Sequence, residues 1–482
     1  MKPHISRFLP RFNARWRTVL PLIAVVATGC QTMSPRARSM DAVKLPASWK
    51  TGAGFSQATV SVDLSKWWGE FHDPVLTALI RESIESSPSL KSAHSVVRES
   101  RARRSSEGSA LLPTLTGGLG SSDGWTRSDS ATGAAVSDHT KLYSAGLNAS
   151  WEVDLFGKQK ASVAAAGADL SEAEETLRSV QASLASEVAL AYLNLRAAES
   201  RLAVVRENVK ILESTLELAS WREQAGQGDA LDAQRAKSNV EQVRSSIPTL
   251  EQAIESAKNS LALLAGKSPG ALDDLLAKRT GKLPEPPRKL AVGIPADTMR
   301  QRPDVRGAGY AWLAAVYRTH SAEAARMPSL SLNGSLGVDS SVASHLLNPE
   351  RVAANVIAGL TSPIFDGGKI RSQIAIQSEQ QEQALQNYRK QVLTALSEVQ
   401  DALVACQKNE ERAAITAKAL AAARDAEQLA RQRYEAGVVD ITTVLDTQQS
   451  RLSLQEQAVT VRADRSSSFV ALYKALGGGW KK

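Results

Sequence analysis

Two short segments of the chain combine glycines with aspartates. These candidate site residues are Gly226, Gly228, Asp229 and Asp232 in the first segment and Gly437, Asp440 and Asp446 in the second. The carboxylates of aspartates attract cations, and their charge responds to pH and to divalent ions. The alternative is structural: glycine ends one helix, and Asp229 and Asp440 cap the next. On either interpretation Asp232 and Asp446 fall in a first helical turn, where negative charge suits the helix dipole.

Cys30 is the other residue with a candidate chemical role, as a site of lipid attachment. Residues 1–29 combine five basic residues and no acidic one with an apolar run over 19–27, which is the pattern of a secretory signal. The run is too short to cross a bilayer as a helix. Two small residues before Cys30 resemble a lipobox, although Ala27 stands where leucine is usual, and Gln31 resembles an outer-membrane address. We expect acylation of Cys30; ordinary cleavage that leaves a free thiol is the alternative.

The sequence patterns of enzymes are missing. The six histidines are scattered and form no His-Glu-x-x-His motif. Residues 266–268 end like a phosphate-binding loop, but Leu261 stands where the first glycine is required. Cys406 is the one cysteine besides Cys30, and its place on an apolar helix seam predicts a small buried residue. The sequence therefore predicts no catalytic residue, no metal site and no cofactor.

The charge balance gives no reason to expect a nucleic-acid partner. The formal net charge is +8, but five of these charges belong to segment 1–29, which leaves the mature chain at +3. A charge so close to balance does not indicate nucleic-acid binding.

Internal repetition dominates the chain. Pro88 and Pro113 are separated by 25 positions, and so are Pro303 and Pro328. Lys158 to Gly226 spans 68 positions, and Lys369 to Gly437 spans the same number. Because fixed spacing between matched landmarks indicates repeated architecture, we interpret the chain as a duplication. The matched pairs are 87–90 with 302–305, 112–115 with 327–330, 156–158 with 365–369 and 224–229 with 435–440.

Each half predicts a helix, a strand pair, a very long helix and a returning helix. The long helices contain no proline and would each be about 100 Å long. Their apolar residues recur in steps of three and four, with one stutter from Leu184 to Val188, which is a coiled-coil seam. The strands alternate apolar and polar residues. The expected long helices are 158–224 and 369–435, the strands 114–125, 142–155, 329–338 and 355–365, and the shorter helices 83–110, 230–266, 297–325 and 441–475.

The strand count bears on oligomeric state. Four strands cannot close a barrel, and open sheet edges in lipid leave backbone groups without hydrogen bonds. Outer-membrane barrels have at least about 8 strands and usually an even number. Three chains of four strands would give twelve, so we favour a homotrimer around a pore, with a dimer as the alternative.

Several segments carry a resemblance to a known family. Residues 67–76, 87–90, 151–157, 261–266 and 473–480 resemble signatures of the TolC-like outer-membrane factors, and Cys30 places the chain nearest their lipoprotein, NodT-type branch. The resemblance implies a mixed, mainly α fold whose trimer forms a 12-stranded transmembrane β-barrel continued by a long periplasmic α-helical coiled-coil barrel. It also implies a periplasmic adaptor and an inner-membrane pump as partners. The turns near Gly226 and Gly437 would form the periplasmic tip, where Asp446 matches one member of the family's acidic ring.

These patterns predict the organisation and function of the chain. We expect a passive outer-membrane duct of a tripartite efflux or secretion system, lipid-anchored, with a large periplasmic part and cargo such as drugs. A type I protein-secretion component, a pore-free periplasmic coiled-coil scaffold or adaptor, and a general porin are the alternatives. The expected parts are a signal peptide (1–29), an N-terminal equatorial segment (30–74), a first repeat (75–270), a linker (271–296), a second repeat (297–475) and a tail (476–482).

Overall fold

The computed structural model describes residues 46, 48–49, 55–57, 64–129, 135–287, 290–292, 295–347 and 352–480. These residues belong to two compact units, each of which combines parts of both repeats. The first, called the sheet unit, contains Arg103–Ala166 and Leu313–Gln381. The second, called the helical unit, contains Ser39–Ala102, Gly167–Trp312 and Glu382–Lys482.

The order of elements confirms the duplication. Both long helices have 67 residues, with the predicted bounds. The first half contains α2 (Pro74–Ser86), α3 (Pro88–Ser109), β2 (Thr114–Asp129), β3 (Ala135–Val153), α4 (Lys158–Gln224), α5 (Ala230–Arg244) and α6 (Ser246–Leu264). The second half contains α8 (Pro295–Gln301), α9 (Pro303–Ala324), β5 (Ser329–Ser340), η5 (Ala343–Leu347), β6 (Val352–Thr361), α10 (Lys369–Glu435) and α11 (Ile441–Ala475). The remaining elements are β1 (Phe55–Gln57), η3 (Trp67–Phe71), α7 (Asp273–Leu276), η4 (Ala277–Arg279) and β4 (Leu290–Val292).

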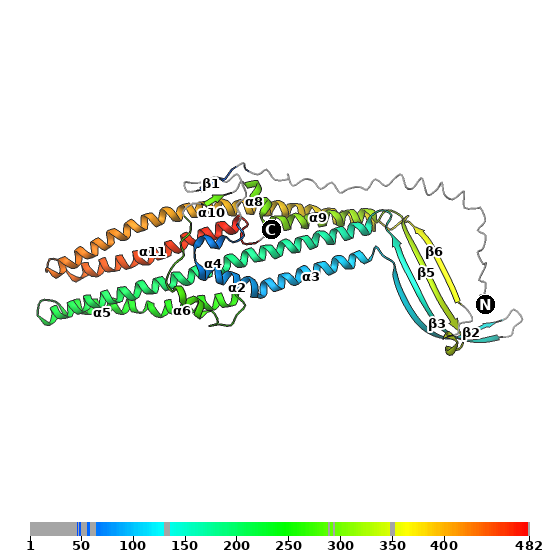
Figure 1. Ribbon diagram of the computed structural model, residues 1–482, viewed down its shortest axis with the longest axis horizontal. Coiled ribbons are helices and arrows are strands. Elements are labelled where there is room, and N and C mark those ends of the chain that lie inside the picture. Colours follow the sequence, from blue (N-terminus) through cyan, green and yellow to red (C-terminus); the bar gives the residue numbers. More distant parts are fainter. Residues whose placement is uncertain are drawn as a thin grey trace, which may run out of the picture. The chain divides into compact units, whose positions relative to one another are not determined.

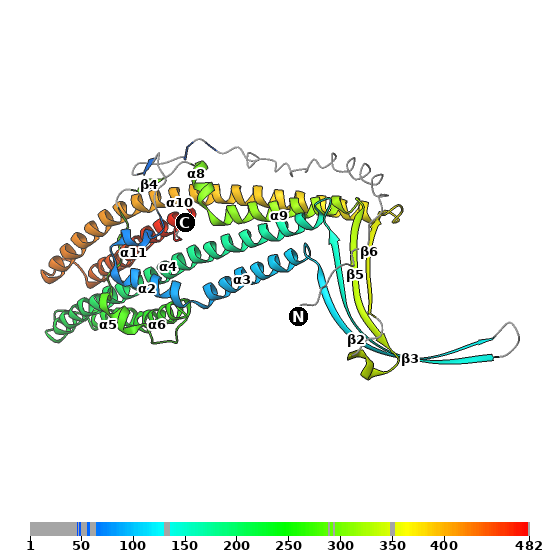
Figure 2. The same ribbon diagram turned by 45° about the vertical axis from the view of Figure 1, so that its right-hand side comes forward.

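Four antiparallel strands form the sheet of the sheet unit, in the order β2-β3-β5-β6. The inner pair β3–β5 joins the two repeats, so β2 and β6 are the edges. Strands β2 and β3 continue beyond the end of β5 as a two-stranded ribbon (Figure 2). The predicted bounds 114–125 and 142–155 were therefore too short at this end, since residues 126–129 and 135–141 also belong to β2 and β3. Cross-strand contacts stabilise the ribbon, since the rings of Trp125 and His139 stack with centroids 4.1 Å apart.

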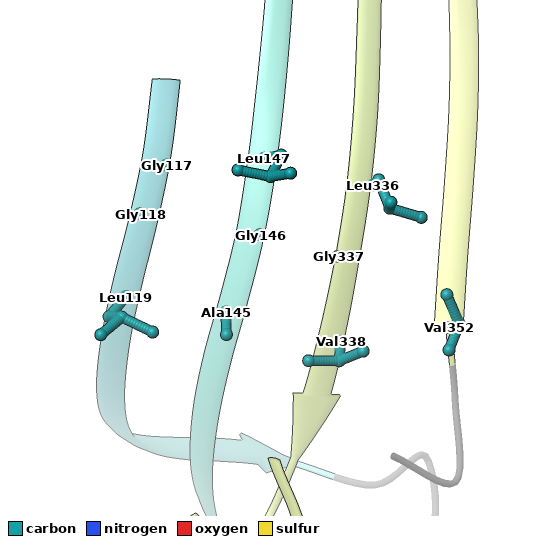
Figure 3. Close-up of a pocket in the computed structure, with 10 residues that line it drawn as sticks. All are labelled: Gly117, Gly118, Leu119, Ala145, Gly146, Leu147, Leu336, Gly337, Val338 and Val352. Carbon is teal, nitrogen blue, oxygen red and sulfur yellow. The ribbon is translucent and has the colours of Figure 1, made fainter. Parts of the chain in front are cut away.

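The two faces of the sheet differ in polarity, as the alternation predicted. Leu115, Leu119 and Leu147 share one face with Leu336 and Val356, and all five are exposed. A shallow cavity of about 690 Å³ lies on the sheet, lined by four glycines and by residues such as Leu119, Leu147 and Leu336 (Figure 3). The opposite face carries serines, asparagines and glycines from all four strands. A face of exposed leucine and valine is the pattern of a strand that contacts lipid.

The short helices differ from the prediction because prolines interrupt them. The expected helix 83–110 is two helices, α2 and α3, which meet where Ser87 has an extended ψ of 128° before Pro88. The expected helix 297–325 is likewise divided between α8 and α9 at Pro303. The expected helix 230–266 is divided at Ser245, because Pro248 has no amide hydrogen to donate to the carbonyl four residues earlier. Only 441–475 forms one uninterrupted helix, α11, as predicted.

Glycine-capped helix ends pack against these proline breaks in both repeats. Gly266, after α6, has a φ of 66°, and a Cβ there would lie 2.7 Å from Cδ of Pro88. Gly477, after α11, has a φ of 80°, and a Cβ there would lie 3.2 Å from Cα of Arg302. Backbone chains that approach this closely leave no room for a side chain, so glycine is required for packing as well as for conformation.

Arg302 holds the second break together through a buried network. Its side chain is 6% exposed and donates to the carbonyl of Ala475 at 2.8 Å and to carboxylates of Asp304 and Glu398 at 2.6 Å each. Burial opposes the charge on Asp304, but hydrogen bonds from Arg302 and Gln391 more than offset it and hold the pKa of Asp304 below its usual value. In the first repeat an uncharged hydrogen bond joins the corresponding elements: Ser86, beside the first break, donates to the carbonyl of Ala265 at 2.6 Å.

Shorter helices flank the long helices in the helical unit (Figure 1). Buried Val97 of α3 packs against Leu170 and Ala173 of α4. The pair Arg206–Glu251 joins α4 to α6 at 2.7 Å. Helix α11 lies beside α10 in the same way. Shorter helices of the same repeat therefore flank each long helix in the helical unit.

Hydrogen bonds hold the linker between the repeats against α4 of the first repeat and α11 of the second. Fully buried Arg196 of α4 donates to the carbonyl of Leu276 and to Glu199, each at 2.7 Å. Glu199 in turn accepts the amide of Gly281 at 2.7 Å, and Ser466 of α11 donates to the carbonyl of Pro284 at 2.8 Å.

Among the described residues, no helix is long and apolar enough to span a bilayer.

Candidate functional site

The two helical turns that carry the predicted site residues have the same backbone geometry. Gly226 and Gly437 have φ values of 71° and 74°. After each glycine, the next amide donates to a carbonyl five residues earlier, from Gln227 to Arg222 and from Val438 to Arg433. Both turns thus end a long helix with a left-handed glycine cap, which satisfies its last carbonyls.

The aspartates that follow these turns are not equivalent. Asp229 is the N-cap of α5, and its carboxylate accepts the amide of Leu231 at 3.0 Å. Asp440 occupies the N-cap position of α11 but makes no capping hydrogen bond with its side chain. Asp232 lies in the first turn of α5, as predicted. Asp446 does not: it is the sixth residue of α11, beyond the first turn, so the dipole argument fails there.

Exposure separates the possible roles of these groups. Asp446 is exposed, Asp232 is half-buried, and Gly228 lies close to the backbone of α4, where a Cβ would meet that of Arg222 at 3.2 Å. The side chain of Asp446 is therefore accessible to solvent, whereas Gly228 is explained by close packing. Cys30, the predicted lipid attachment site, lies outside the described residues.

Arg222 is the residue that the sequence analysis missed. Its guanidinium donates to the carbonyl of Tyr434 at 2.6 Å and lies 4.7 Å from the centre of that ring. The hydrogen bond joins the last turn of α4 to the last turn of α10, and so connects the two repeats. Burial raises the pKa of Tyr434, which Arg222 partly offsets. The only sequence signal was position, because Arg222 and Tyr434 each lie four or fewer residues before a turn glycine.

A small apolar core lies beneath this contact. It contains Ala219, Ala236, Ala430, Tyr434, Ile441, Val444 and Leu445. Three large apolar residues beside the turns remain exposed, namely Trp221 at 60%, Leu231 at 51% and Val438 at 70%. The end of the helical unit therefore combines a small apolar core with exposed apolar side chains beside both turns.

Comparison with known proteins identifies the family. The model of the outer membrane efflux protein family matches residues 79–267 and 294–478. The chain is 33% identical to the pyoverdine export outer membrane protein OpmQ of Pseudomonas aeruginosa, over 90% of this chain and 91% of that protein. It is 30% identical to the cation efflux system protein CusC of Escherichia coli, over 95% of this chain and 98% of that protein.

Solved structures agree with this assignment. The outer-membrane channel OprN superposes with a TM-score of 0.84 at 29% identity, covering 91% of this chain and 98% of that one. The chain belongs to the outer membrane efflux protein family, the TolC-like channels of the outer membrane. It is a non-enzymatic efflux channel component, as the absence of catalytic motifs predicted.

Proposed function

We propose that three copies of this chain form a lipid-anchored duct that carries small molecules out of the periplasm. The observation that supports the trimer best is the sheet, whose edges β2 and β6 have no partner strand within the described part of one chain. In lipid such edges are costly, because their backbone groups cannot bond to water. Edge-to-edge pairing of β2 with β6 of the next copy would satisfy both edges and give twelve strands. Cys30 would carry the lipid anchor.

The gate in this proposal is the pair of turns near Gly226 and Gly437. In the closed state the contact between Arg222 and Tyr434 keeps the two hairpins of one protomer together. Opening separates the hairpins and lets ions and cargo pass the exposed carboxylates of Asp446, with Asp232 behind them. A periplasmic adaptor, coupled to an inner-membrane pump, would bind the exposed apolar residues Trp221 and Val438 and so favour the open state.

The names of the relatives support a proposal for the cargo class. OpmQ is named for pyoverdine export, CusC for cation efflux and TtgF of Pseudomonas putida for toluene efflux. We propose small-molecule cargo for this chain, with selection left to the pump because the described polar face of the sheet offers mainly serine, asparagine and glycine.

Deletion and complementation test this function. A strain that lacks the gene should become sensitive to some of a panel of drugs, solvents, metal ions and siderophores, and the intact gene should restore resistance. The Cys30→Ser variant should lose acylation, measured by incorporation of labelled palmitate, while its trimer still forms. A deletion strain with unchanged resistance to the whole panel but a lost secreted protein would instead indicate protein secretion. A chain released by salt as a monomer would exclude the duct.

A further inference from the structure

The apolar face of the sheet is hollowed where a glycine replaces a larger side chain. Leu147 and Leu336 lie side by side on this face, and Gly117 is the neighbour of Leu147 in the same row. The cavity of about 690 Å³ lies at this row, and Leu119 and Val352 also line it (Figure 3). Aliphatic side chains around a floor of backbone offer dispersion contacts along the length of a hydrocarbon chain. The hollow therefore suits an acyl chain.

Two aromatic residues mark the ends of this apolar face on β3. Trp151 lies near the helical end and Tyr143 near the ribbon, and both share a face with Leu147 because an even number of positions separates them from it. Eight positions separate the two aromatic residues, which corresponds to about 26 Å along the strand. Apolar bands of outer-membrane barrels are about 25 Å tall and are flanked by aromatic residues. The level of the lipid headgroups thus begins beyond Tyr143, at the ribbon.

The same face continues onto the ribbon as a patch of charged and aromatic residues. Asp123 lies opposite Lys141, and Trp125 lies opposite His139. Nε2 of His139 lies 2.5 Å from Oδ1 of Asp123, and its ring stacks on Trp125, which remains 78% exposed. Arg127, the next residue of β2 on this face, is exposed as well. These five residues, called the ribbon patch, present an aromatic ring, a carboxylate and two permanent cations on the lipid side.

Charge is distributed unevenly between the two faces of the ribbon. Within residues 121–127 and 137–143, the basic side chains Arg127, His139 and Lys141 all lie on the face of the patch. Within the same residues, the opposite face carries Asp138 as its one charged side chain. A surface whose cations all lie on one side attracts anions there.

We propose that this face binds a phosphorylated glycolipid of the outer leaflet, with an acyl chain in the hollow and the phosphorylated sugar on the ribbon patch. Lys141 and Arg127 would bind phosphate through charge-assisted hydrogen bonds. The exposed ring of Trp125 would stack on the C–H groups of a sugar, because the face of an aromatic ring is negative. The carboxylate of Asp123 would accept hydrogen bonds from sugar hydroxyls. The inference rests on the proposed function only in that the sheet crosses the outer membrane with the ribbon outside.

The spacing of the hollow and the patch matches the length of a lipid. Gly146 of the hollow and Lys141 of the patch are five positions apart on β3, which is about 17 Å along the strand. Half of a hydrocarbon core of about 30 Å is about 15 Å, which is the depth that an acyl chain spans below its headgroup. One lipid can therefore occupy both places at once.

The patch distinguishes this ligand from simpler ones. An anionic phospholipid would satisfy the cations and fill the hollow, but it would bring no sugar to Trp125 and Asp123. A glycolipid without phosphate would bring no anion to Lys141 and Arg127. Inorganic phosphate has no chain to fill the hollow. A ligand that combines phosphate, sugar and acyl chains matches the hollow and the patch together.

Native mass spectrometry and thermal melts of the purified trimer, titrated with defined lipids, test the proposal. Lipid A that carries its phosphates should bind about tenfold more tightly than the same glycolipid without them, because charge-assisted hydrogen bonds are lost. Lys141→Met should weaken the binding of phosphorylated lipid A about tenfold. Lys160→Met is the matched control and should bind as the parent does, since Lys160 is an exposed lysine at the start of α4, at the other end of the sheet.

Two further variants separate the sugar from the acyl chain. Trp125→Ala should reduce the preference for lipid A over phosphatidylglycerol, while the binding of phosphatidylglycerol stays constant. Gly117→Leu should fill the hollow and weaken the binding of both lipids. The strand can accommodate this substitution, because a Cβ at Gly117 would meet Leu147 at an ordinary contact of 3.4 Å.

Equal binding of lipid A with and without its phosphates to the parent chain would overturn the proposal, even if a variant failed to fold. So would parent-like binding by Lys141→Met, binding of phosphatidylglycerol as tight as that of lipid A, or displacement of lipid A by inorganic phosphate at equal concentration. Complementation of efflux is measured separately. Intact efflux with a flat lipid titration contradicts this inference alone, whereas phosphate-dependent binding of lipid A without efflux contradicts the proposed function alone.

Discussion

Replacing Arg222 with alanine should open the duct, because its side chain makes the described polar contact between the two turns. The change removes the 2.6 Å hydrogen bond to the carbonyl of Tyr434 and the stacking of the guanidinium 4.7 Å from the ring centre. The apolar core beneath, which includes Ile441 and Val444, is left in place. The variant therefore tests the contact rather than the fold.

The size of the effect can be worked from these two contacts. A hydrogen bond from a charged donor contributes about 1.5–3 kcal/mol, and the half-exposed position of Arg222 favours the lower end. A cation–π contact at an exposed site adds about 0.5–1 kcal/mol. A loss of about 2 kcal/mol per protomer corresponds to an increase of roughly thirtyfold in the population with separated turns.

Single-channel conductance in planar bilayers measures this population directly. Arg222→Ala should show more frequent or larger openings than the parent channel, and amides near Tyr434 should exchange hydrogen faster. Arg235→Ala is the matched control, because Arg235 is an exposed arginine of the neighbouring helix α5. Unchanged conductance together with unchanged hydrogen exchange in Arg222→Ala would refute the reasoning. So would an equal effect of the control substitution, since charge alone would then explain the openings.

Two further predictions concern the breaks in the repeats. Gly266→Ala should lower the free energy of unfolding by about 2 kcal/mol or more, because alanine is strained at a left-handed φ and its Cβ would strike Pro88. Gly108→Ala, where a Cβ meets nothing within 4 Å, should instead raise it by up to about 1 kcal/mol; chemical denaturation compares the two. The pKa of Asp304 is lowered in the folded chain. The ionised carboxylate therefore stabilises the fold at pH values above 3.8, the ordinary pKa of an aspartate, and this stabilisation is lost as the pH falls below 3.8. The Asp304→Asn variant should therefore be less stable than the parent at pH 7, and it should lose less stability than the parent when the pH is lowered. An equal loss of stability in the parent and the variant on acidification would contradict this role of the Asp304 carboxylate.

Local pattern was sufficient to predict most elements of the fold. The absence of proline and the three-and-four spacing predicted both long helices with their observed bounds. Strict alternation predicted the strand pairs and their two faces. The short helices were misjudged where a proline inside a helical pattern was not treated as a break, at Pro88, Pro248 and Pro303.

The candidate site was only partly predictable. Gly226, Gly437 and Asp229 could be assigned because cap geometry is set by a few neighbouring residues. Asp446 was assigned to the first turn although the start of its helix at Ile441 was predicted correctly; as the sixth residue of α11 it lies beyond that turn. The contact of Arg222 with Tyr434 had no signal in the sequence beyond the position of both residues shortly before a turn glycine.

The sequence by itself determined periodicity, duplication and the residues at each turn, because these depend on the order of side chains along one helix or strand. The tertiary structure decided which distant positions meet. Arg222 and Tyr434 are 212 positions apart, and Ser86 and Ala265 are 179 apart. Such contacts depend on how whole elements pack, and a hydrogen bond to a backbone carbonyl requires no particular residue on the accepting side. A carbonyl acceptor leaves no pattern in the sequence, which is why only the folded chain revealed the contact between the two turns.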